Sequence, residues 1–474
     1  MSEPRVVILG AGPAGLGAAY RLRLEGRASV TVVEQSLAVG GNSGSFEAGG
    51  QYLDYGSHRL HPACNAEILA DIRRLLGGDL LDRPRHGRIH LRGKLIHFPL
   101  KPGDLLLRLD KGFALGTLRD MTAKVLKKRE EGDSFASVLM ANLGPTICRD
   151  FYFPYAAKIW GRAANELSAI QARRRVSAGS FSKLVKKVVT ALPGLKPPGS
   201  GRFFYPRKGF GQISEAYASA ARGSGAELML GWTVKSLTRA SANGDGGWTV
   251  GIEKDGERRT LDADYVWSTV PISLLARMMV PAAPSPVLKA ASQIEYRAML
   301  LIYLQLDVNQ FTEYDAHYFP SSGIAITRLS EPKNYSASDE PAGSTTLCAE
   351  LPCEPEDRYW RMSDEELGKQ VEADLSRAGI PLRRPPVAVR VRRLRHAYPI
   401  YKQGYEKHFQ VLDQWTEGLQ RLLTYGRQGL FAHDNTHHAL YMAYRAADCL
   451  RPDGFDHAQW AEHRKVFETH VVED

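Results

Sequence analysis

The chain has 474 residues, about three times the commonest domain size, so one very large domain or two to three interleaved domains are expected. Hydrophobic residues make up 43% and charged residues 24%, which excludes the disordered and collagen-like classes. Lys and Arg outnumber Asp and Glu by 62 to 52, a formal charge of +10 that favours an acidic partner such as a phosphorylated ligand or a membrane surface. Nucleic acid is not expected, because the sequence lacks zinc-finger spacing, an RNP-type aromatic motif and a basic region joined to heptads.

The sequence predicts a cytoplasmic protein. It begins MSEPRVVILGAG, without the regions of a secretory signal, and its longest apolar stretch, Ala298 to Leu306, is too short to span a membrane. The cysteines show neither CxxC nor metal spacing, so a disulfide framework or a metal site is not expected. They are Cys64, Cys148, Cys348, Cys353 and Cys449. Lys183, Lys186 and Lys187 lie on an amphipathic pattern, which leaves peripheral contact with anionic lipid open.

Residues 5–34 follow the order strand, glycine-rich turn, helix, strand. Arg5 to Leu9 is a short β-branched run, and Leu16 to Leu24 is rich in helix-forming residues. Between them, Gly10 to Gly15 has the GxGxxG form. A second strand, Ser29 to Val33, ends at Glu34. The order and the spacing together predict a dinucleotide-binding unit.

Each glycine has a separate role in such a unit. Gly10 permits the tight turn, Gly12 lets the backbone approach a pyrophosphate, and Gly15 lets helix and strand pack closely. The phosphate rests at the start of the helix, where backbone N–H groups have no partner. Glu34 stands where an acidic side chain accepts hydrogen bonds from a ribose. On this pattern alone, NAD and FAD both remain open.

The continuation favours FAD. After Glu34 the chain reads Gln-Ser-Leu-Ala-Val-Gly-Gly-Asn-Ser, which resembles the segment after the second strand in FAD-binding two-domain flavoproteins. The resemblance implies that FAD is the cofactor and that Gly40, Gly41 and Asn42 bind it.

A histidine-bearing loop follows. The segment from Asp54 to His61 resembles the loop of the UDP-galactopyranose mutases that lies near the flavin ring in that family. The resemblance implies catalytic roles for His58 and His61, and a near-neutral imidazole suits proton transfer. A surface loop with structural histidines is an alternative. A metal pair is another, although it would need a further carboxylate or histidine in reach.

Residues 76–200 alternate amphipathic helical stretches with polar breaks and predict a mainly helical substrate cap. Within them, Tyr-Ala-Ala-Lys-Ile-Trp-Gly and the arginines that follow resemble a block shared by these mutases and protoporphyrinogen-oxidase-like flavoproteins. The resemblance implies that Tyr155 and Trp160 line the substrate cavity and take part in catalysis, and that Arg175 holds a diphosphate. Core packing of the aromatics and a solvated charge run over Arg173 to Arg175 are the alternatives.

The chain then returns to the cofactor domain. Ala226 to Val234 and Trp248 to Ile252 predict strands on either side of a polar turn at 243–247, with Val234 expected to contact the cofactor. Asp264 to Pro271 predicts a buried strand, which closes the FAD sheet in the resembling families. Residues 276–394 predict a second substrate-domain segment, with a core strand at 298–306 and a helix at 364–378 that is capped by Ser363.

The last segment carries a third group of candidates. Ala397 to Tyr401, then Gly-Arg-Gln-Gly and Asp-Asn, resemble the C-terminal return to the flavin in these families. Substrate contacts are implied at Tyr398 and Tyr401, and FAD contacts at Arg427, Asp434 and Asn435. The cluster at 433–438 precedes a helix expected at 439–450, so plain helix capping and a metal site are alternatives for it.

His433 is a candidate catalytic residue in the same segment. The mutases carry a tyrosine after their Gly-Arg-x-Gly segment, and this chain has Phe431 or His433 there. Mutase activity is therefore not implied by that position.

These matches run in family order over nearly the whole chain. The sequence resembles the amine-oxidase/protoporphyrinogen-oxidase-like superfamily, on the branch nearest the UDP-galactopyranose mutases. The resemblance implies an α/β fold, in which a Rossmann-like FAD-binding domain carries a discontinuous inserted α+β substrate domain. The FAD-binding segments are 1–75, 201–275 and 395–474, and the substrate-domain segments are 76–200 and 276–394.

Three functions remain open on the sequence. The first is an FAD-dependent oxidoreductase that acts on an anionic substrate, such as a nucleotide sugar or a glycosylated molecule, by hydride transfer to flavin N5. The second is a mutase that contracts the ring of a nucleotide sugar with no net redox change. The third is a flavoprotein fold kept as a non-catalytic binding module. The superfamily as a whole favours the first.

Overall fold

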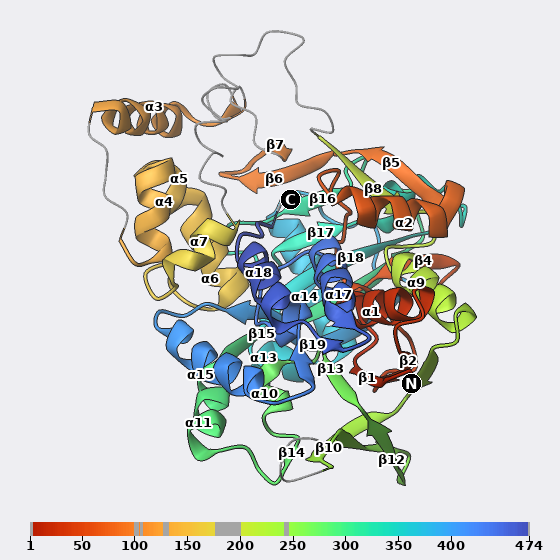
Figure 1. Cartoon of the computed structure of the whole chain (residues 1–474). Coiled ribbons are helices and arrows are strands. Elements are labelled where there is room, and N and C mark those ends of the chain that lie inside the picture. Colours follow the sequence, from red (N-terminus) through yellow and green to blue (C-terminus); the bar gives the residue numbers. More distant parts are fainter. Residues whose placement is uncertain are drawn as a thin grey trace.

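The computed structural model describes residues 3–98, 104, 108–126, 132–175, 201–240 and 246–472. Within them the strands form a parallel sheet, two mixed sheets and three two-stranded sheets, and helices surround these (Figure 1). The lysines at 183, 186 and 187 and most of the turn at 243–247 lie outside the described residues. No helix in the described part of the chain is both long and apolar enough to cross a membrane.

The parallel sheet is built from distant parts of the chain. In spatial order it consists of β20 (Leu422–Thr424), β13 (Tyr265–Ser268), β1 (Arg5–Leu9), β2 (Ser29–Glu34) and β9 (Glu227–Leu230). Every neighbouring pair is parallel. The strand expected to close this sheet, β13, lies inside it, because β20 pairs along its outer edge. The strands are apolar and buried, as a sheet covered on both faces requires.

Helices cover the parallel sheet. The chief ones are α1 (Pro13–Leu24), α9 (Gln212–Gly223), α17 (Thr436–Cys449), α2 (Ala66–Leu76) and α18 (His457–Phe467). Helix α1 packs along both α9 and α17. At Gly17 of α1 an added Cβ atom would lie 2.9 Å from Leu440 of α17, so the close approach of these two helices requires glycine.

The small mixed sheet contains β12 (Glu257–Ala263), β11 (Trp248–Lys254), β10 (Thr233–Arg239) and β14 (Met279–Val280). One strand was expected from Ala226 to Val234, and that expectation is wrong. Gly231 has a φ of +79° and separates β9 from β10, which therefore belong to different sheets.

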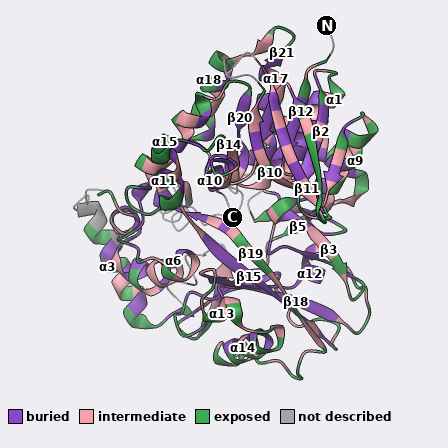
Figure 2. Cartoon of the chain, turned by 90° about the horizontal axis from the view of Figure 1, so that it is seen from below, coloured by how far each residue is buried: buried purple, intermediate pink, exposed green. Residues whose placement is uncertain are grey.

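The large mixed sheet forms a separate layer, in which β15 is almost entirely buried (Figure 2). In spatial order it consists of β19 (Ala388–Ile400), β15 (Glu295–Leu306), β18 (Thr345–Cys353), β17 (Arg328–Ser330), β16 (Ala316–Tyr318), β6 (Gly87–Leu91) and β7 (Lys94–Phe98). Helix α14 (Asp364–Arg377) packs on it, and Ser363 is its N-cap, as the sequence predicts; Glu366 completes a capping box.

The stretch from 76 to 200 is not mainly helical at its start. β5 (Leu80–Pro84) pairs with β8 (Arg202–Pro206), and β6 and β7 form a hairpin. Arg92 and Gly93 both have positive φ values, +51° and +71°, as the two central residues of a type I′ turn require. The helices follow: α3 (Lys111–Leu126), α4 (Phe135–Leu143), α5 (Pro145–Ile147), α6 (Phe153–Trp160) and α7 (Ala169–Arg175), with a π-helical turn at Cys148–Tyr152.

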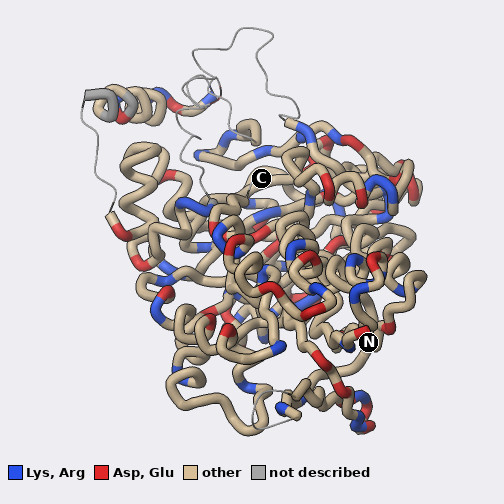
Figure 3. Tube along the Cα trace, viewed as in Figure 1, with Lys and Arg blue, Asp and Glu red and all other residues tan. Residues whose placement is uncertain are grey.

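The remaining elements complete the fold. They are the 3-10 turns Gly41–Ser43 and Gly77–Asp79, β3 (Ser45–Ala48), β4 (Gln51–Asp54), α10 (Ile272–Leu275), α11 (Ser285–Gln293), α12 (Pro332–Ser336), α13 (Arg358–Arg361), α15 (Tyr405–Glu417), α16 (Gly426–Gly429), β21 (Leu450–Arg451) and β22 (Gly454–Phe455). Basic and acidic residues are interspersed over the described chain (Figure 3). The net positive charge is therefore not confined to one element.

Candidate functional site

The turn between β1 and α1 forms an open cradle. An added Cβ atom on Gly15 would lie 1.9 Å from the carbonyl oxygen of Gly10, so only glycine allows the helix to start so close to the strand. On Gly12 the nearest atom would be 3.9 Å away, at Gly41, which leaves space in front of the helix. Among the described residues no side chain caps the start of α1. Its free N–H groups therefore fit a pyrophosphate.

Glu34 stands beside this cradle at the end of β2. One carboxylate oxygen accepts a hydrogen bond of 2.9 Å from the Ala11 amide, and the other accepts one of 2.8 Å from the Ser36 amide. The side chain is 9% exposed. Its position is thus fixed by the backbone, and lone pairs remain for the hydroxyl groups of a ribose.

The second glycine pair faces the first. The amide of Gly40 donates to the carbonyl of Ala11 over 2.8 Å, and Gly40 and Gly41 both have positive φ values. The Asn42 side chain donates to the carbonyl of His396 over 3.0 Å and so ties the cradle to β19. The structure brings the predicted glycines, Glu34 and Asn42 together at the carboxyl ends of β1 and β2 in the parallel sheet.

Val234 lies in β10 and pairs with Ile252. The Trp232 amide, at the entry to this strand, donates to the backbone carbonyl of Glu34 over 3.0 Å. The segment that leads to Val234 therefore runs along the end of β2.

The two loop histidines have different surroundings. Nε2 of His58 lies 3.0 Å from the carbonyl of Asn42 and 2.9 Å from that of Tyr55, so it carries the proton. Burial lowers the pKa of His58, which keeps the ring neutral with Nδ1 as its acceptor. His61 accepts a hydrogen bond at Nδ1 from the Ala63 amide over 3.1 Å. The two rings are thus engaged separately.

Arg59, between these histidines, has a structural role that the sequence does not indicate. Its guanidinium group lies 3.1 Å from Asp315, is 9% exposed and stacks over the rings of Phe203 and Tyr335. This buried ion pair fixes the histidine loop to β16 of the large mixed sheet.

An aromatic wall surrounds His433. The imidazole is fully buried and meets Trp160 edge to face at 6.4 Å between ring centroids. Tyr401 meets it edge to face at 4.8 Å, and Tyr398 stacks with it at 6.5 Å. The hydroxyl group of Tyr401 donates to the carbonyl of Phe431 over 2.8 Å. Helix α6, strand β19 and the segment after α16 thus converge on one histidine.

Arg427 joins the same region through the backbone. Its guanidinium group donates to the carbonyl of Asp434 over 3.2 Å and to that of Ala397 over 2.9 Å. It lies 5.2 Å from the centre of the Tyr398 ring. Arg427 therefore holds the segment before α17 against β19.

A second buried ion pair was not predicted. Arg328 on β17 and Glu350 on β18 form two parallel hydrogen bonds of 2.9 and 2.8 Å, with 16% and 4% of their side chains exposed. The Ser57 amide also donates to Glu350, over 2.7 Å, next to the histidine loop. The two residues are cross-strand partners, so no local sequence signal could have identified the pair.

Arg328 lies among the candidate residues. Burial raises the pKa of Tyr155 well above its usual value, and the positive charge of Arg328 opposes that shift. The same charge contributes to the lowered pKa of His58. Tyr155 and Tyr398 in turn favour the charged form of Arg328. One residue from each of the histidine loop, α6 and β19 is thus electrostatically coupled to the same guanidinium group.

In the arginine run, Arg174 lies beside the aromatic wall. Its guanidinium group lies 6.0 Å from the centre of the Tyr401 ring, and its charge is coupled to that of Asp434. Arg173 is exposed. The side chain of Arg175 lies outside the described residues, so its expected diphosphate contact stays a prediction.

Asp434 and Asn435 begin α17. Asn435 is the N-cap, and its amide donates to Nδ1 of His438 over 3.2 Å in a capping box. Asp434 is buried against His438 and His470. The helix starts earlier than expected, at Thr436.

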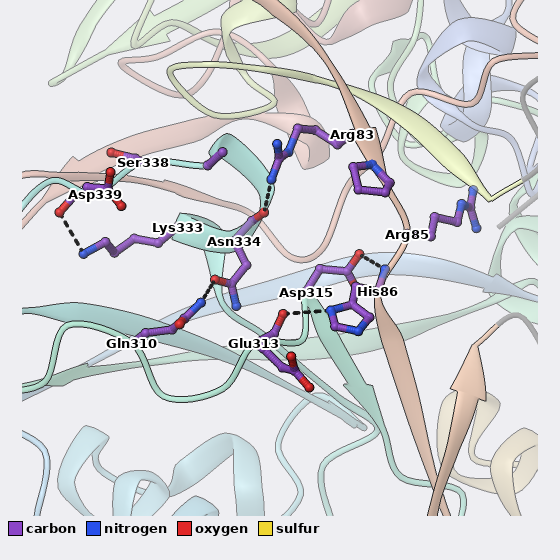
Figure 4. Close-up of a pocket in the computed structure, with 12 residues that line it drawn as sticks. Arg83, Arg85, His86, Gln310, Glu313, Asp315, Lys333, Asn334, Ser338 and Asp339 are labelled. Carbon is purple, nitrogen blue, oxygen red and sulfur yellow. Dashed lines mark hydrogen bonds between the residues drawn. The ribbon is translucent and has the colours of Figure 1, made fainter.

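A polar cavity of about 470 Å³ lies between β5 and α12, apart from the predicted residues (Figure 4). Arg83, Arg85 and Lys333 line it together with Glu313 and Asp339. Nζ of Lys333 already donates to backbone carbonyls such as those of Pro341 and Ser344. Charges of both signs therefore line this cavity.

Comparison with known proteins gives a family and a fold. The model of a family described as flavin containing amine oxidoreductase matches residues 13–450. Reduced UDP-galactopyranose mutase superposes with a TM-score of 0.81 at 20% identity, over 99% of this chain and 100% of that chain. No curated protein sequence matches.

Two further solved structures have the same fold. A protein assigned as a protoporphyrinogen oxidase from Exiguobacterium sp. 255-15 gives a TM-score of 0.70 at 19% identity, over 94% of this chain and 98% of that chain. Putrescine oxidase bound to putrescine gives 0.65 at 19% identity, again over 94% and 98%.

Proposed function

The chain belongs to the family of flavin-containing amine oxidoreductases, and we propose that within this family it oxidises an anionic small molecule whose negative charge binds Arg328. FAD is the cofactor. When bound, FAD supplies the acceptor for a hydride. The glycine cradle fits its pyrophosphate, and Glu34 fits a ribose, because the geometry at both places leaves room or lone pairs for these groups.

The observation that supports an anionic substrate is the unoccupied edge of the Arg328 guanidinium group. Glu350 accepts from Nε and Nη2 of the guanidinium group, and within the described part of the chain Nη1 donates no hydrogen bond. Glu350 holds the guanidinium plane rigidly, so the two N–H groups of Nη1 are set in direction before a ligand arrives. Carboxylate and phosphate oxygens are the acceptors that such an edge binds best.

His433 supports oxidation rather than binding alone. Hydride removal from the carbon of an alcohol or of an ammonium group requires the oxygen or nitrogen to release one proton, and a base must accept it. His433 lies in a dry aromatic wall of Trp160, Tyr398 and Tyr401, from which water is excluded. In our proposal the substrate enters between these aromatic rings, which orient it and open the buried imidazole to it, and the imidazole accepts the proton.

The test is an anaerobic titration of the FAD-loaded enzyme with amines and alcohols, each in a neutral and in a carboxylated or phosphorylated form. Bleaching of the oxidised flavin spectrum reports hydride transfer. We expect bleaching with anionic compounds only, and a loss of affinity of roughly tenfold or more for them in Arg328→Lys, which cannot form the same two-bond geometry. Arg258→Lys, at an 84% exposed position of the small mixed sheet, is the control. Bleaching by neutral and anionic forms alike would refute the role of Arg328.

A mutase is the second candidate, because the superposition on reduced UDP-galactopyranose mutase extends over nearly all of both chains. In that case Arg328 would bind the diphosphate of a nucleotide sugar. The discriminating experiment is to incubate the chemically reduced enzyme with UDP-galactose and to analyse the sugar chromatographically. A new ring isomer without net reoxidation of the enzyme would favour the mutase over the oxidase.

A further inference from the structure

Asp434 is a buried carboxylate whose two oxygens accept no hydrogen bond from the described residues. Its side chain is 0% exposed, and Nδ1 atoms of His438 and His470 both lie 3.4 Å from Oδ1. Burial alone would raise the pKa of Asp434, but imidazole beside the carboxylate outweighs this effect and holds the pKa below its usual range. A buried negative charge of this kind requires a donor or a positive charge beside it.

The two imidazoles are not equivalent. Nδ1 of His438 accepts the backbone N–H of Asn435 over 3.2 Å, so the lone pair of that nitrogen is in use and it carries no proton. It therefore cannot donate to Asp434. Nδ1 of His470 has no hydrogen-bond partner among the described residues. His470 is thus the group that can turn an N–H toward the carboxylate.

The same three side chains have the donor set of a divalent cation site. Two features oppose that alternative. The lone pair of His438 is directed at the Asn435 amide, and the rings of His438 and His470 stack almost parallel, with centroids 4.2 Å apart and an angle of 14°. In-plane lone pairs of parallel rings do not converge on one ion.

His470 comes from the C-terminal segment beyond α18. The His470 amide donates to the carbonyl of Phe467 over 3.2 Å, and the Val472 amide donates to that of Arg174 over 3.0 Å. Residues 468–472 therefore connect the end of α7 in the helical layer to the start of α17.

We propose that His470 is a positioning residue of the candidate site, which directs Nδ1–H at Asp434 and thereby fixes residues 433–435 in front of α17. The inference rests on the proposed function in taking His433 to face the substrate. The contact between His470 and Asp434 affects more than the position of His433. Helix α17 packs along α1, and the start of α1 forms the cofactor cradle. Loss of the contact would let the segment from His433 to Asn435 shift.

The test compares His470→Ala with His470→Asn in the FAD-loaded enzyme. An asparagine amide nitrogen can occupy the place of Nδ1, whereas alanine leaves Asp434 without a donor. We expect His470→Ala to weaken FAD binding roughly tenfold, within the range for contacting residues in double-mutant cycles, and to shift the flavin absorption spectrum. We expect His470→Asn to restore most of both. His457→Ala, at an exposed position that begins α18, should change neither.

A cycle with Asp434→Asn completes the experiment. Because that change removes the buried charge, adding His470→Ala to it should cause no further loss of FAD affinity. The proposal is overturned if alanine and asparagine at 470 behave alike, if the two changes are additive, or if one equivalent of Zn²⁺ binds the wild type and requires all three side chains. No substrate enters these measurements, so they give an answer even where the proposed oxidation fails.

Discussion

The hydroxyl group of Tyr205 donates a hydrogen bond of 2.6 Å to Oδ2 of Asp54, and both side chains are buried. Burial raises the pKa of Asp54 to about 6, against the opposing effect of its hydrogen bonds from Ser45, Tyr205 and the Phe210 amide. Since this pKa exceeds that of an unfolded chain, roughly 3.9, the contribution of Asp54 to stability is complete below pH ~4 and is lost as the pH rises through about 6.

Tyr205→Phe should therefore destabilise the protein more at pH 8 than at pH 5. At pH 8 the carboxylate loses a charge-assisted hydrogen bond, which costs about 1–3 kcal/mol, whereas at pH 5 the group is mostly protonated. Urea denaturation at the two pH values measures the difference. Tyr217→Phe is the control, because the Tyr217 hydroxyl lies against that of Tyr444 and not against a carboxylate. An equal loss for Tyr205→Phe at both pH values would contradict the assignment.

Gly12 and Gly15 should respond differently to substitution. An added Cβ atom on Gly12 meets nothing closer than 3.9 Å, so Gly12→Val should fold with nearly the wild-type Tm but fail to retain FAD. Gly15→Ala places an atom 1.9 Å from the Gly10 carbonyl and should lower the Tm even without cofactor. Flavin absorbance after purification and thermal unfolding of the apoprotein check both. Yellow, fully loaded Gly12→Val protein would refute the placement of the pyrophosphate.

Breaking the Arg328–Glu350 pair from one side should be costly. Arg328→Met leaves the Glu350 carboxylate, which is 4% exposed, without its partner. We expect this change to lower the free energy of unfolding by about 3–5 kcal/mol. The double variant Arg328→Met/Glu350→Gln should recover a large part of this loss, because no unpaired charge remains. Denaturant midpoints of the two variants decide the matter. Equal midpoints would mean that the unpaired charge of Glu350 does not cause the loss of stability.

His433→Asn should reduce kcat far more than it changes substrate binding. General-base catalysis typically contributes about 10²–10⁴-fold, and asparagine cannot accept a proton at neutral pH. Rapid-reaction kinetics of flavin reduction give this rate separately from affinity. Tyr398→Phe, which keeps the stacked ring and removes only a hydroxyl group, is the matched comparison. A rate of reduction unchanged in His433→Asn would leave the proposed base without support.

Ser363→Ala should destabilise the protein by about 1 kcal/mol, the usual effect of losing an N-cap. Its hydroxyl group accepts a hydrogen bond from the Glu366 amide, and the Glu366 carboxylate accepts one from the Ser363 amide. Ser376→Ala, which removes a hydroxyl from the exposed side of the same helix, should change stability much less. A similar loss in both variants would mean that the serine hydroxyl, and not the cap, is responsible.

Local patterns explain what the sequence could predict. The turn at Gly10–Gly15, the acidic end of β2, the core of β15 and the cap of α14 each depend on residues a few positions apart. Such patterns can be recognised in the sequence without knowledge of the tertiary fold. The residues of the aromatic wall lie on three distant elements, so only the resemblance to a known family could indicate them.

The sequence pattern gives the wrong element where one or two residues in a turn decide the structure. The hairpin of β6 and β7 depends on the turn at Arg92 and Gly93, within a segment whose overall pattern predicts helices. The hydrophobic pattern predicts one strand across Gly231, where the chain leaves one sheet for another. In both cases the glycine conformation, and not the hydrophobic period, sets the boundary.

Contacts between distant residues could not be predicted. Arg59 with Asp315, Arg328 with Glu350 and His470 with Asp434 join separate elements, and each partner alone is an ordinary charged residue in the sequence. Only the register of the large mixed sheet and the path of the C-terminal segment bring them together.

The order of the parallel sheet has a consequence for synthesis of the protein. β1 leaves the ribosome first, yet it lies between β2 and β13, and β20 must still join the edge of β13. Nearly the whole chain must therefore be made before the sheet beneath the glycine cradle is complete. Because non-local strand pairing is slow and leaves open edges, nascent chains that end before Leu422 should depend on chaperones and should be unable to acquire the flavin during translation.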